Sequence, residues 1–335
     1  MIKSEFKVIG VMSGTSLDGI DLIYAHFKHT TNWSFSIVKA ETVPYSTEWL
    51  NCLRQLVSYS KTELKTIDED YTVYLANLIL AFIDKHSITD LDVVCSHGHT
   101  ALHNPEQGFT YQIGNLPKLA KILQKNVVCD FRIQDVELGG QGAPLVPIGD
   151  ALLFSDYDFC LNLGGFANVS TEIKGERIAF DVCPVNIVLN HYVQPLGFNY
   201  DDRGKLASVG MVNAELLHQL NALPFYESDY PKSLGLEWVV QYIFPLIDAQ
   251  DLDVHDVLRT CVEHIAIQIA KILPVSKPAS LLITGGGAYN SFLIKRLQSL
   301  SICNIIIPND AVVEYKEALI FGLLGILKLR GEVNC

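Results

Sequence analysis

The densest group of residues that could do chemistry lies in residues 8–27. Two apolar runs flank a Ser-Gly-Thr-Ser segment at 13–16 and an Asp-Gly pair at 18–19. Asp-Gly between apolar runs predicts a hairpin, because both central residues of the tight turn need a positive φ. The loop amides and small hydroxyls suit a phosphate, and Asp18 and Asp21 could hold its Mg²⁺ directly or through water. An ordinary tight hairpin explains this local pattern equally well.

Two glycine-rich loops occur later in the chain. Gly164 and Gly165 follow an apolar segment at 159–163, and a glycine triplet at 285–287 follows the apolar segment 280–284. A helix is expected after the triplet, from about Ser291 to Leu300. Consecutive glycines at a strand-to-helix turn allow a ligand to approach the positive end of the helix. Alone, such a triplet most often marks only a tight turn.

Asp181 is the candidate general base. It ends an apolar segment at 178–181, and Pro184 is expected to stop the strand soon afterwards. An acid at the end of a central strand would face a cleft, where a base must reach its proton donor. A solvated aspartate at a turn is the alternative interpretation of the same pattern.

A histidine-rich segment and a nearby arginine suggest a second kind of site. His97, His99 and His103 could be zinc ligands in a metallohydrolase, although no second ligand motif is recognisable in the sequence. Arg132 has the planar fork that matches a carboxylate ligand, but an internal pair with Asp130 or Asp135 is equally consistent with the sequence. Lys232 is a further candidate for a basic group near phosphate.

Composition bounds the class of protein. The 335 residues are 49% hydrophobic and 19% charged, which predicts a globular chain with two domains. The net charge of −12, without a run of Lys or Arg, disfavours nucleic acid and anionic membranes as partners. The start of the chain has no signal-peptide pattern, and the apolar stretch 318–327 is too short to span a bilayer. The eight singly spaced cysteines indicate reduced thiols, and we expect a cytoplasmic location.

The elements that must position these residues repeat along the chain. Helical material around 47–86 and apolar strands at 91–95 and 127–131 belong to the first half, which ends with an apolar helix at 145–154. A strand, a small polar loop and a strand then recur after Asp158. We therefore expect one α/β lobe at 1–154 and a second at 155–314, with a helix at about 315–335 packing back on the first.

The sequence resembles a known enzyme family. Residues 12–21, Met-Ser-Gly-Thr-Ser-Leu-Asp-Gly-Ile-Asp, are similar to the N-terminal signature of the anhydro-N-acetylmuramic acid kinases. Matching segments continue to about residue 325. That family belongs to the superfamily of sugar kinases, Hsp70 chaperones and actin. The resemblance implies a two-lobed, actin-like fold, built as a ribonuclease H-like duplication, with ATP in the interdomain cleft.

The resemblance also implies roles for particular residues. Asp181 falls on the family's catalytic aspartate, although the family commonly reads Phe-Asp-Thr-Gly-Pro-Gly-Asn where residues 180–186 read Phe-Asp-Val-Cys-Pro-Val-Asn. His97 becomes a sugar-pocket residue, and His99 replaces a glutamine. Arg132 is expected to bind the lactyl carboxylate, and Glu317 to point into the sugar site. The implied nucleotide-binding residues are Gly14, Thr15, Ser16, Leu17, Asp18, Gly19, Ile20, Asp21, Gly164, Gly165, Asn168, Gly285, Gly286 and Gly287.

The implied activity is that of an unusual kinase in cell-wall peptidoglycan recycling. ATP with Mg²⁺ would phosphorylate 1,6-anhydro-N-acetylmuramic acid while water opens the anhydro ring, giving N-acetylmuramic acid 6-phosphate and ADP. Asp18 would hold the Mg²⁺, directly or through water, and a homodimer is expected. Two other classes stay open: a nucleotide-dependent binding protein like actin or an Hsp70 chaperone, and the His-x-His metallohydrolase.

Overall fold

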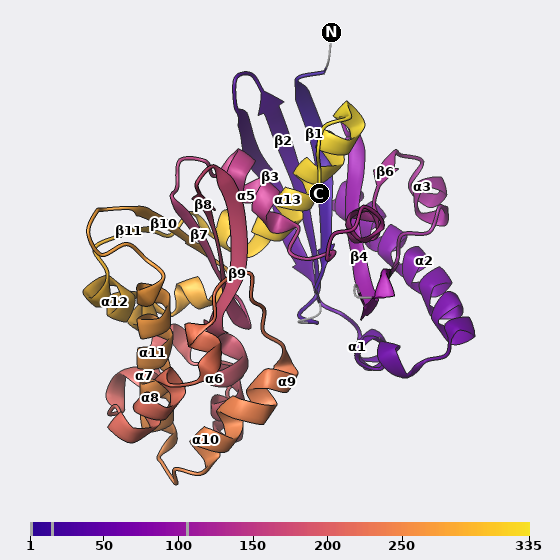
Figure 1. The fold of residues 1–335 in the computed structure, drawn as a ribbon. Helices are drawn as coiled ribbons and strands as arrows, with labels where there is room; N and C mark the ends of the chain where they lie inside the picture. The colour runs from indigo at the N-terminus through magenta and orange to yellow at the C-terminus, as the bar shows by residue number, and fades with distance from the viewer. Residues whose placement is uncertain (1–2, 15–16, 105–106) are drawn as a thin grey trace. The chain divides into compact units, whose positions relative to one another are not determined.

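The chain, seen in a computed structural model, folds as two compact units (Figure 1). Unit 1 consists of Met1–Phe154 and Tyr315–Cys335, and unit 2 of Ser155–Glu314. The structure describes residues 3–14, 17–104 and 107–335. Within these ranges, no helix combines the length and the apolar character needed to cross a lipid bilayer.

Unit 1 contains a mixed sheet of order β3-β2-β1-β4-β5, in which β6 also pairs with β4. Its strands are β1 (Glu5–Ser13), β2 (Ile20–His29), β3 (Trp33–Val43), β4 (Val93–Asn104), β5 (Phe109–Ile113) and β6 (Val127–Val128). Its helices are α1 (Thr47–Arg54), α2 (Lys61–Lys85), α3 (Lys118–Leu123), α4 (Phe131–Glu137), α5 (Val146–Leu153) and most of α13 (Asp310–Arg330). The strand expected at 127–131 is therefore cut short, because helix α4 begins at Phe131.

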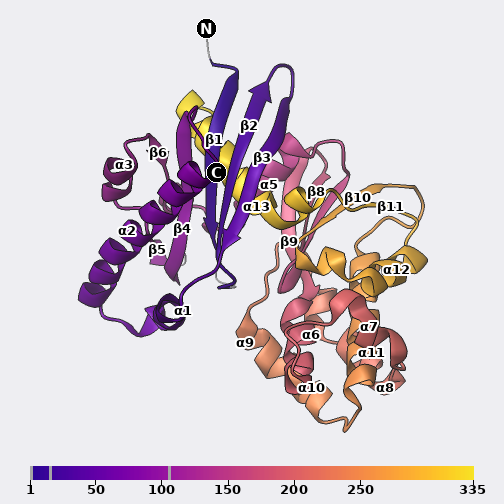
Figure 2. The ribbon, with the colours of Figure 1, turned by 180° about the vertical axis from the view of Figure 1, so that it is seen from behind.

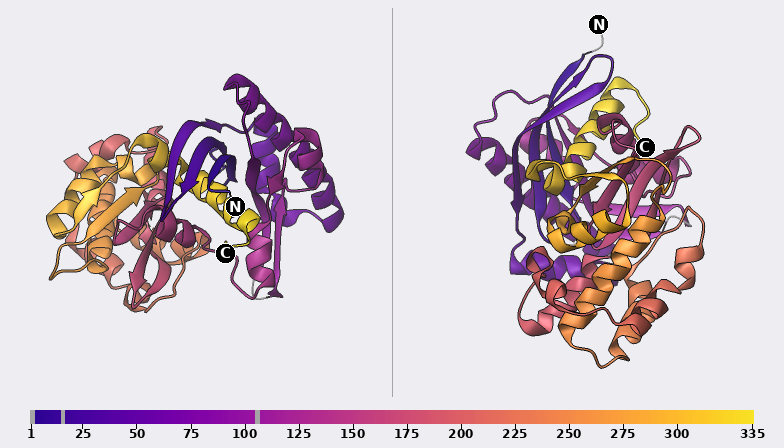
Figure 3. Two further views of the ribbon diagram at one scale, coloured as in Figure 1. Left: turned by 90° about the horizontal axis from the view of Figure 1, so that it is seen from above. Right: turned by 90° about the vertical axis from the view of Figure 1, so that its left-hand side faces the viewer.

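Helices cover both faces of this sheet (Figure 3). Tyr71 and Leu75 of α2 are fully buried against the face that carries Ile9 and Val11. Helix α13 lies close against the other face: a Cβ on Gly325 would be 2.1 Å from the sulfur of Cys95 in β4. Small residues at this crossing thus let helix and sheet approach more closely than larger side chains would allow.

Unit 2 contains a second mixed sheet, of order β11-β10-β7-β8-β9. Its strands are β7 (Phe159–Leu163), β8 (Phe166–Ile173), β9 (Glu176–Pro184), β10 (Ser280–Thr284) and β11 (Asn304–Ile306). Its helices include α6 (Asn186–Val193), α7 (Lys205–Val209), α8 (Ala214–Asn221), α9 (Leu236–Trp238), α10 (Phe244–Asp248), α11 (Val254–Lys271) and α12 (Ser291–Leu300). Leu161 and Leu163 of β7 and Leu258 and Ile265 of α11 belong to one buried core, around which α6, α7 and α8 also gather (Figure 2).

The two units share one strand order. In unit 1, β1, β2 and β3 form an antiparallel meander, and β4 and β6 follow in parallel on the other side of β1. In unit 2, β7, β8 and β9 form the same meander, and β10 and β11 follow in parallel beside β7. Each unit thus has an antiparallel meander of three strands and two parallel strands beside the first strand of that meander. This repeated arrangement is the duplicated ribonuclease H-like topology of actin-like sugar kinases. The expected α/β fold class is confirmed.

Candidate active site

The first loop connects β1 to β2 in unit 1. Ser13 pairs with Ile20 in an antiparallel ladder, so the expected hairpin is present, but its connection is six residues long rather than a tight Asp-Gly turn. Leu17, not Asp18, has the left-handed conformation, with φ 61°. The prediction of a tight turn at Asp18-Gly19 was therefore wrong, and the Leu17 amide donates to the Gly14 carbonyl (3.3 Å).

The expected nucleotide-binding residues of this loop differ in solvent exposure and in hydrogen-bond partners. Asp18 is exposed, and no described residue bonds its carboxylate. Asp21 is half-buried and accepts a hydrogen bond from Thr42 Oγ1 on β3 (2.6 Å). The side chain of Ile20 is fully buried in the core, and its main chain lies in the sheet, paired with Ser13 on β1 and Val43 on β3. Thr15 and Ser16 lie outside the described residues.

A buried hydroxyl network lies directly before the loop. Ser13 Oγ lies 2.6 Å from Tyr45 OH, 2.8 Å from Tyr71 OH and 2.9 Å from His99 Nδ1. Burial lowers the pKa of His99 to about 4, so its imidazole is neutral at physiological pH. A serine hydroxyl has one hydrogen and two lone pairs, and these three contacts use them all. The network fixes Ser13 from three other parts of unit 1.

The histidine segment lies on β4, where the strand bulges. Val11 pairs with Ser96 and Ser13 with His99, so β4 carries one extra residue at this point. His97 is buried, and its Nδ1 donates to the Gly98 carbonyl (2.9 Å). Its Nε2 therefore accepts from the Arg132 guanidinium (3.1 Å). Burial, together with the positive charge of Arg132, lowers the pKa of His97 to about 3 and keeps the ring neutral.

Arg132 does not form either internal ion pair that the sequence allowed. Its Nη1 donates to the Gly142 carbonyl (2.7 Å). The Asp135 carboxylate instead accepts a hydrogen bond from the Gly142 amide (2.6 Å). In the part of the chain that the structure describes, no carboxylate comes within 4 Å of the guanidinium, and the Arg132 Nε–H is buried without a partner. Arg132 thus keeps one unused buried donor, and the negative charges that act on it are those of Glu317 and Asp135.

Glu317 lies on α13 within electrostatic range of Arg132. Burial raises the pKa of the Glu317 carboxyl, and the charges of Lys316 and Arg132 partly oppose that rise. Lys316 is itself buried and pairs with Asp150 of α5 (3.1 Å), which anchors the helix beside Glu317. The structure therefore brings His97, Arg132 and Glu317 together in unit 1.

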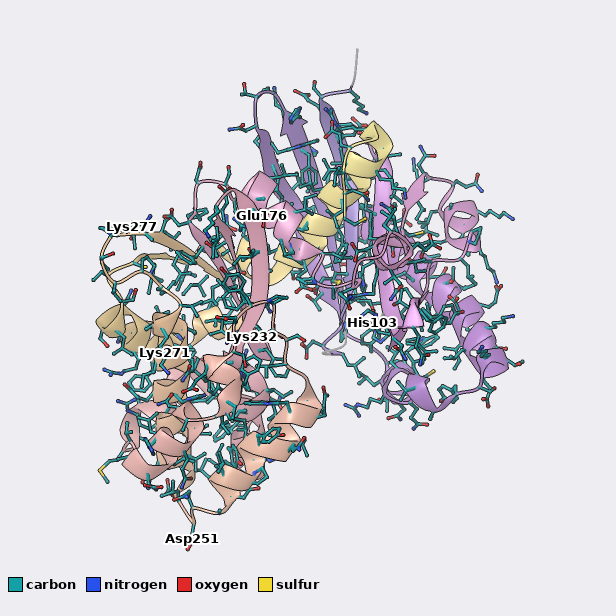
Figure 4. The ribbon with its side chains drawn as sticks, viewed as in Figure 1. His103, Glu176, Lys232, Asp251, Lys271 and Lys277 are labelled. Atoms are coloured by element: carbon teal, nitrogen blue, oxygen red, sulfur yellow. The ribbon has the colours of Figure 1, made fainter. Side chains whose placement is uncertain are left out.

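The histidines do not form a metal cluster. His97 and His99 use their Nδ1 atoms as described above, and His103 Nδ1 contacts Thr110 Oγ1 (3.2 Å) near the end of β4 (Figure 4). Over the described ranges, no three His, Cys, Asp or Glu side chains converge so that they could hold a metal ion. The described histidines thus show no arrangement of zinc ligands, and the role of His97 in a sugar pocket stays a prediction.

The two glycine loops meet within unit 2. Gly164 and Gly165 form the connection between β7 and β8, and the amides of Val185 and Ile187 at the start of α6 donate to the Gly165 carbonyl (2.8 and 3.2 Å). A Cβ on Gly285, which has φ 81°, would lie 2.6 Å from Asn162 Oδ1 at the end of β7. Both loops therefore lie at the same end of the sheet.

Open space adjoins Gly286 of the triplet. A Cβ on Gly286 would meet no described atom within 4 Å, whereas one on Gly287 would lie 2.6 Å from the Leu163 side chain. Gly286 begins a 3₁₀ turn, Gly286–Tyr289, and helix α12 follows with Asn290 as its N-cap. The main chain of Gly286 is thus accessible, next to the N-terminal end of a ten-residue helix.

Asp181 lies inside a strand rather than at its end. Strand β9 ends at Pro184, as expected, but it forms the edge of the sheet, so the expectation of a central strand was wrong. The side chains of Val182, Cys183 and Val185, which depart from the family pattern, are buried in the unit 2 core. These departures therefore change the packing beneath the strand.

One oxygen of Asp181 is bound and the other is free. The Leu234 amide donates to Asp181 Oδ2 (2.8 Å), and the Asp181 amide donates to the Lys232 carbonyl (3.0 Å). No described residue donates to Oδ1. Burial raises the pKa of Asp181, an effect that the Leu234 hydrogen bond partly opposes. A partly desolvated carboxylate with a free oxygen is suited to accept a proton.

Polar side chains form a row across the unit 2 sheet that contains Asp181. Asp181 pairs with Asn168, Asn168 with Asn162, and Asn162 with Thr284. Residues directly opposite each other on neighbouring strands point to the same face. The hydroxyl of Thr284 is buried without a partner among the described residues. This row links the acid on β9 to the glycine loops that follow Leu163 and Thr284.

Sequence reasoning missed several residues around these sites. Asn162 and Thr284 were passed over, although a polar residue inside the apolar segment 159–163 is a recognisable signal. Tyr45 and Tyr71 gave no signal, because their contacts with Ser13 are distant in sequence. Lys232, the candidate phosphate ligand, lies beside β9 (Figure 4), and its ammonium donates to the carbonyls of Phe225 (3.1 Å) and Ser228 (2.9 Å).

The chain is similar to known proteins in sequence and in structure. The model of the family described as anhydro-N-acetylmuramic acid kinase matches residues 6–332. A protein of that name from Pseudomonas syringae pv. tomato is 34% identical, over 88% of this chain and 84% of its own length. One from Francisella tularensis subsp. novicida is 32% identical, over 99% of this chain and 94% of its own length. Component A of (R)-2-hydroxyglutaryl-CoA dehydratase from Acidaminococcus fermentans has 14% identity and a TM-score of 0.49, covering 98% of this chain and all of that one.

The duplicated topology defines a protein of the actin-like fold class. Within that class, the chain belongs to the anhydro-N-acetylmuramic acid kinase family. The expected resemblance is confirmed over nearly the whole chain.

Proposed function

We propose that this protein uses ATP to phosphorylate 1,6-anhydro-N-acetylmuramic acid at O6 while water opens the anhydro ring. The products are N-acetylmuramic acid 6-phosphate and ADP, and the reaction serves peptidoglycan recycling in the cytoplasm. The observation that carries the proposal is the half-buried carboxylate of Asp181, with one oxygen held by a main-chain amide and the other free. Family membership over residues 6–332 supports the same assignment.

Asp181 acts as the general base. Its free oxygen takes a proton from water as the water oxygen bonds to C1 and the C1–O6 bond breaks. The released O6 then attacks the γ-phosphorus, and the bond from that phosphorus to the bridging oxygen breaks to leave ADP. Burial suits Asp181 to this role, because a raised pKa brings a carboxylate closer to the basicity needed at neutral pH.

The sugar contacts come from unit 1. The Arg132 guanidinium, with its unused buried donor, binds the lactyl carboxylate of the substrate, and Glu317 accepts from a sugar hydroxyl. Neutral His97 orients the Arg132 guanidinium by accepting a hydrogen bond at Nε2 (3.1 Å). A buried guanidinium that no carboxylate contacts directly is costly, which is why a carboxylated sugar fits this position better than a neutral one.

In unit 2, main-chain groups of the Gly164–Gly165 and Gly285–Gly287 loops hold the nucleotide together with Asn168. Asp18 fits Mg²⁺, because an exposed carboxylate without a described partner offers the hard oxygen donors that this ion prefers. Mg²⁺, when bound with ATP, offsets the charge on the transferring phosphoryl group. The residues of the chain orient ATP and exclude competing water.

Product analysis in ¹⁸O-labelled water tests the proposal. Purified protein, ATP and anhydro sugar should give a 6-phosphate whose label is at C1 and is absent from the phosphoryl group. Label in the phosphate instead, or ADP release that does not depend on the sugar, would indicate a simple ATPase and overturn the assignment.

A further inference from the structure

The side-chain amide of Asn115 bonds to two separate parts of unit 1. Asn115 lies between β5 and α3, and its Oδ1 accepts from Ser96 Oγ (3.1 Å). Its Nδ2 donates to the His97 carbonyl (3.2 Å) and to Asp130 Oδ1 (3.1 Å). Both amide hydrogens are therefore used, and each connects to a different element.

The first of these parts is the bulge in β4. The extra residue lies at His97–Gly98, and Gly98 has φ 71°, a conformation that few other residues adopt. Asn115 holds the bulge through Ser96 and His97, and a Cβ on Gly98 would lie only 2.7 Å from Asn115 Nδ2. Bulges redirect side chains out of the regular alternation, and this one determines where His97 points.

The second part is the turn into α4. Asp130 precedes that helix and has φ 62°, a left-handed conformation that costs free energy for a residue other than glycine. Its carboxylate accepts from Asn115, which helps to hold the strained residue in place. Arg132 is the second residue of α4, so the direction of the helix determines where its guanidinium lies.

We propose that Asn115 is a positioning residue for the sugar site. One amide holds the bulge that presents His97 and the turn that presents Arg132, and so sets the 3.1 Å contact between Arg132 Nη2 and His97 Nε2. The inference rests on the proposed function, in which these two residues contact or support the substrate. Asn115 itself touches no reacting atom.

Steady-state kinetics of Asn115→Ala test the inference. The KM for the anhydro sugar should rise on the order of 10- to 100-fold, since small displacements of positioned groups are that costly, while the KM for ATP stays unchanged. Because Asn115 acts through its neighbours, the same substitution should add little in a His97→Ala, Arg132→Ala background. An equal additional loss in that background would overturn the inference.

A charge swap provides the rescue. Asn115→Asp alone places two carboxylates against each other and should raise the sugar KM at least as much as Asn115→Ala. Adding Asp130→Asn restores an amide-to-carboxylate bond in the reverse direction, and asparagine tolerates the left-handed conformation better than most residues. The double variant should recover part of the lost affinity, and no recovery would count against the inference.

Asn221 of unit 2 is the matched control. Its Oδ1 contacts His264 Nδ1 (2.8 Å) and accepts from Gln268 (2.6 Å), so Asn221→Ala removes comparable bonds far from the sugar contacts in sequence. It should lower the Tm without changing the sugar KM. If Asn115→Ala behaves like this control, its role is only structural.

A readout independent of turnover separates the two proposals. If the wild-type protein does not phosphorylate the anhydro sugar, the proposed function fails, and imidazole ¹⁵N NMR of His97 then decides the positioning role. The wild type should show a neutral ring with hydrogen on Nδ1, and Asn115→Ala should change the Nε2 resonance as the Arg132 contact loosens. Identical spectra would overturn the inference.

Discussion

Unit 1 and unit 2 share a strand order but use it for different chemistry. In unit 1, Ser13 contacts three buried side chains, and His97 and Arg132 each contact the other and one main-chain carbonyl. In unit 2, Asp181 has one main-chain donor on one oxygen, and the glycine loops offer main-chain groups next to open space. Under the proposed function, the same topology supports a sugar-recognition site in one unit and an accessible acid with phosphate-binding loops in the other.

This difference teaches where specificity and reactivity can be built. A network of buried side chains resists displacement, because moving one member leaves several polar groups unsatisfied, so it suits shape-specific binding. An acid with a free oxygen keeps its capacity to accept a proton. Substitutions in unit 1 should therefore act mainly on the sugar KM, and substitutions of Asp181 on kcat.

The largest effect is expected for Asp181→Asn. The amide is nearly isosteric but cannot accept the proton, so kcat should fall on the order of 10²- to 10⁴-fold. Ring opening and phosphorylation should fall together, while the Tm and the KM for ATP stay close to wild type. Near-normal formation of the 6-phosphate, measured by mass spectrometry, would show that Asp181 is merely structural.

Arg132→Met should mainly weaken sugar binding. A hydrogen bond to a charged group contributes about 1.5–3 kcal/mol, so the sugar KM should rise by roughly 10- to 100-fold with little change in the KM for ATP. Arg177 of unit 2 is the control, because it also has a buried Nε without a described partner and donates to Ser170 (2.8 Å). Equal effects of Arg132→Met and Arg177→Met on the sugar KM would remove the distinction between the units.

Asp18→Ala tests the nucleotide side of unit 1. Loss of a metal-supporting carboxylate should weaken the apparent Mg²⁺ affinity by roughly tenfold or more, and turnover should recover partly at high Mg²⁺. The measurement is a titration of Mg²⁺ at fixed ATP. Unchanged turnover at limiting Mg²⁺ would show that Asp18 holds no metal.

His99→Gln should flatten the pH dependence of stability. The pKa of His99 is about 4 in the folded chain and near 6.5 when unfolded. As pH falls from 6.5 to 4, His99 binds a proton in the unfolded chain but stays neutral in the folded chain, so the free energy of unfolding decreases. Removing this histidine should reduce the slope of the free energy of unfolding against pH by up to about 1.4 kcal/mol per pH unit, measured by urea unfolding. An unaltered slope would contradict the burial of a neutral imidazole, and exposed His218→Gln is the control.

The smallest effects are expected at helix caps outside both sites. Ser60 and Glu63 form a capping box at the start of α2, and Asn213 caps α8 in unit 2 through the Leu216 amide (2.8 Å). Ser60→Ala and Asn213→Ala should each lower the free energy of unfolding by about 1 kcal/mol and leave every KM unchanged. A change in either KM would show that the sites depend on overall stability. Kinetic effects could then not be assigned to one unit.

Local sequence patterns were enough to predict most of the helices and strands that were expected. The helix expected at 291–300 matches α12, and the strands expected at 159–163 and 280–284 match β7 and β10. Apolar periodicity and flanking glycines act within a few residues, so the sequence itself contains this information. The family signature at 12–21 likewise needed only consecutive residues, and the resemblance drawn from it is confirmed.

Tertiary structure alone decided the surroundings of the reactive groups. The sequence left Arg132 free to pair with Asp130 or Asp135, and the fold gave it His97 and the Gly142 carbonyl instead. It also placed Asp181 within an edge strand, because pairing with β8 continues to Pro184. Partners that lie tens of residues apart depend on strand register, bulges and packing, and local spacing does not encode these.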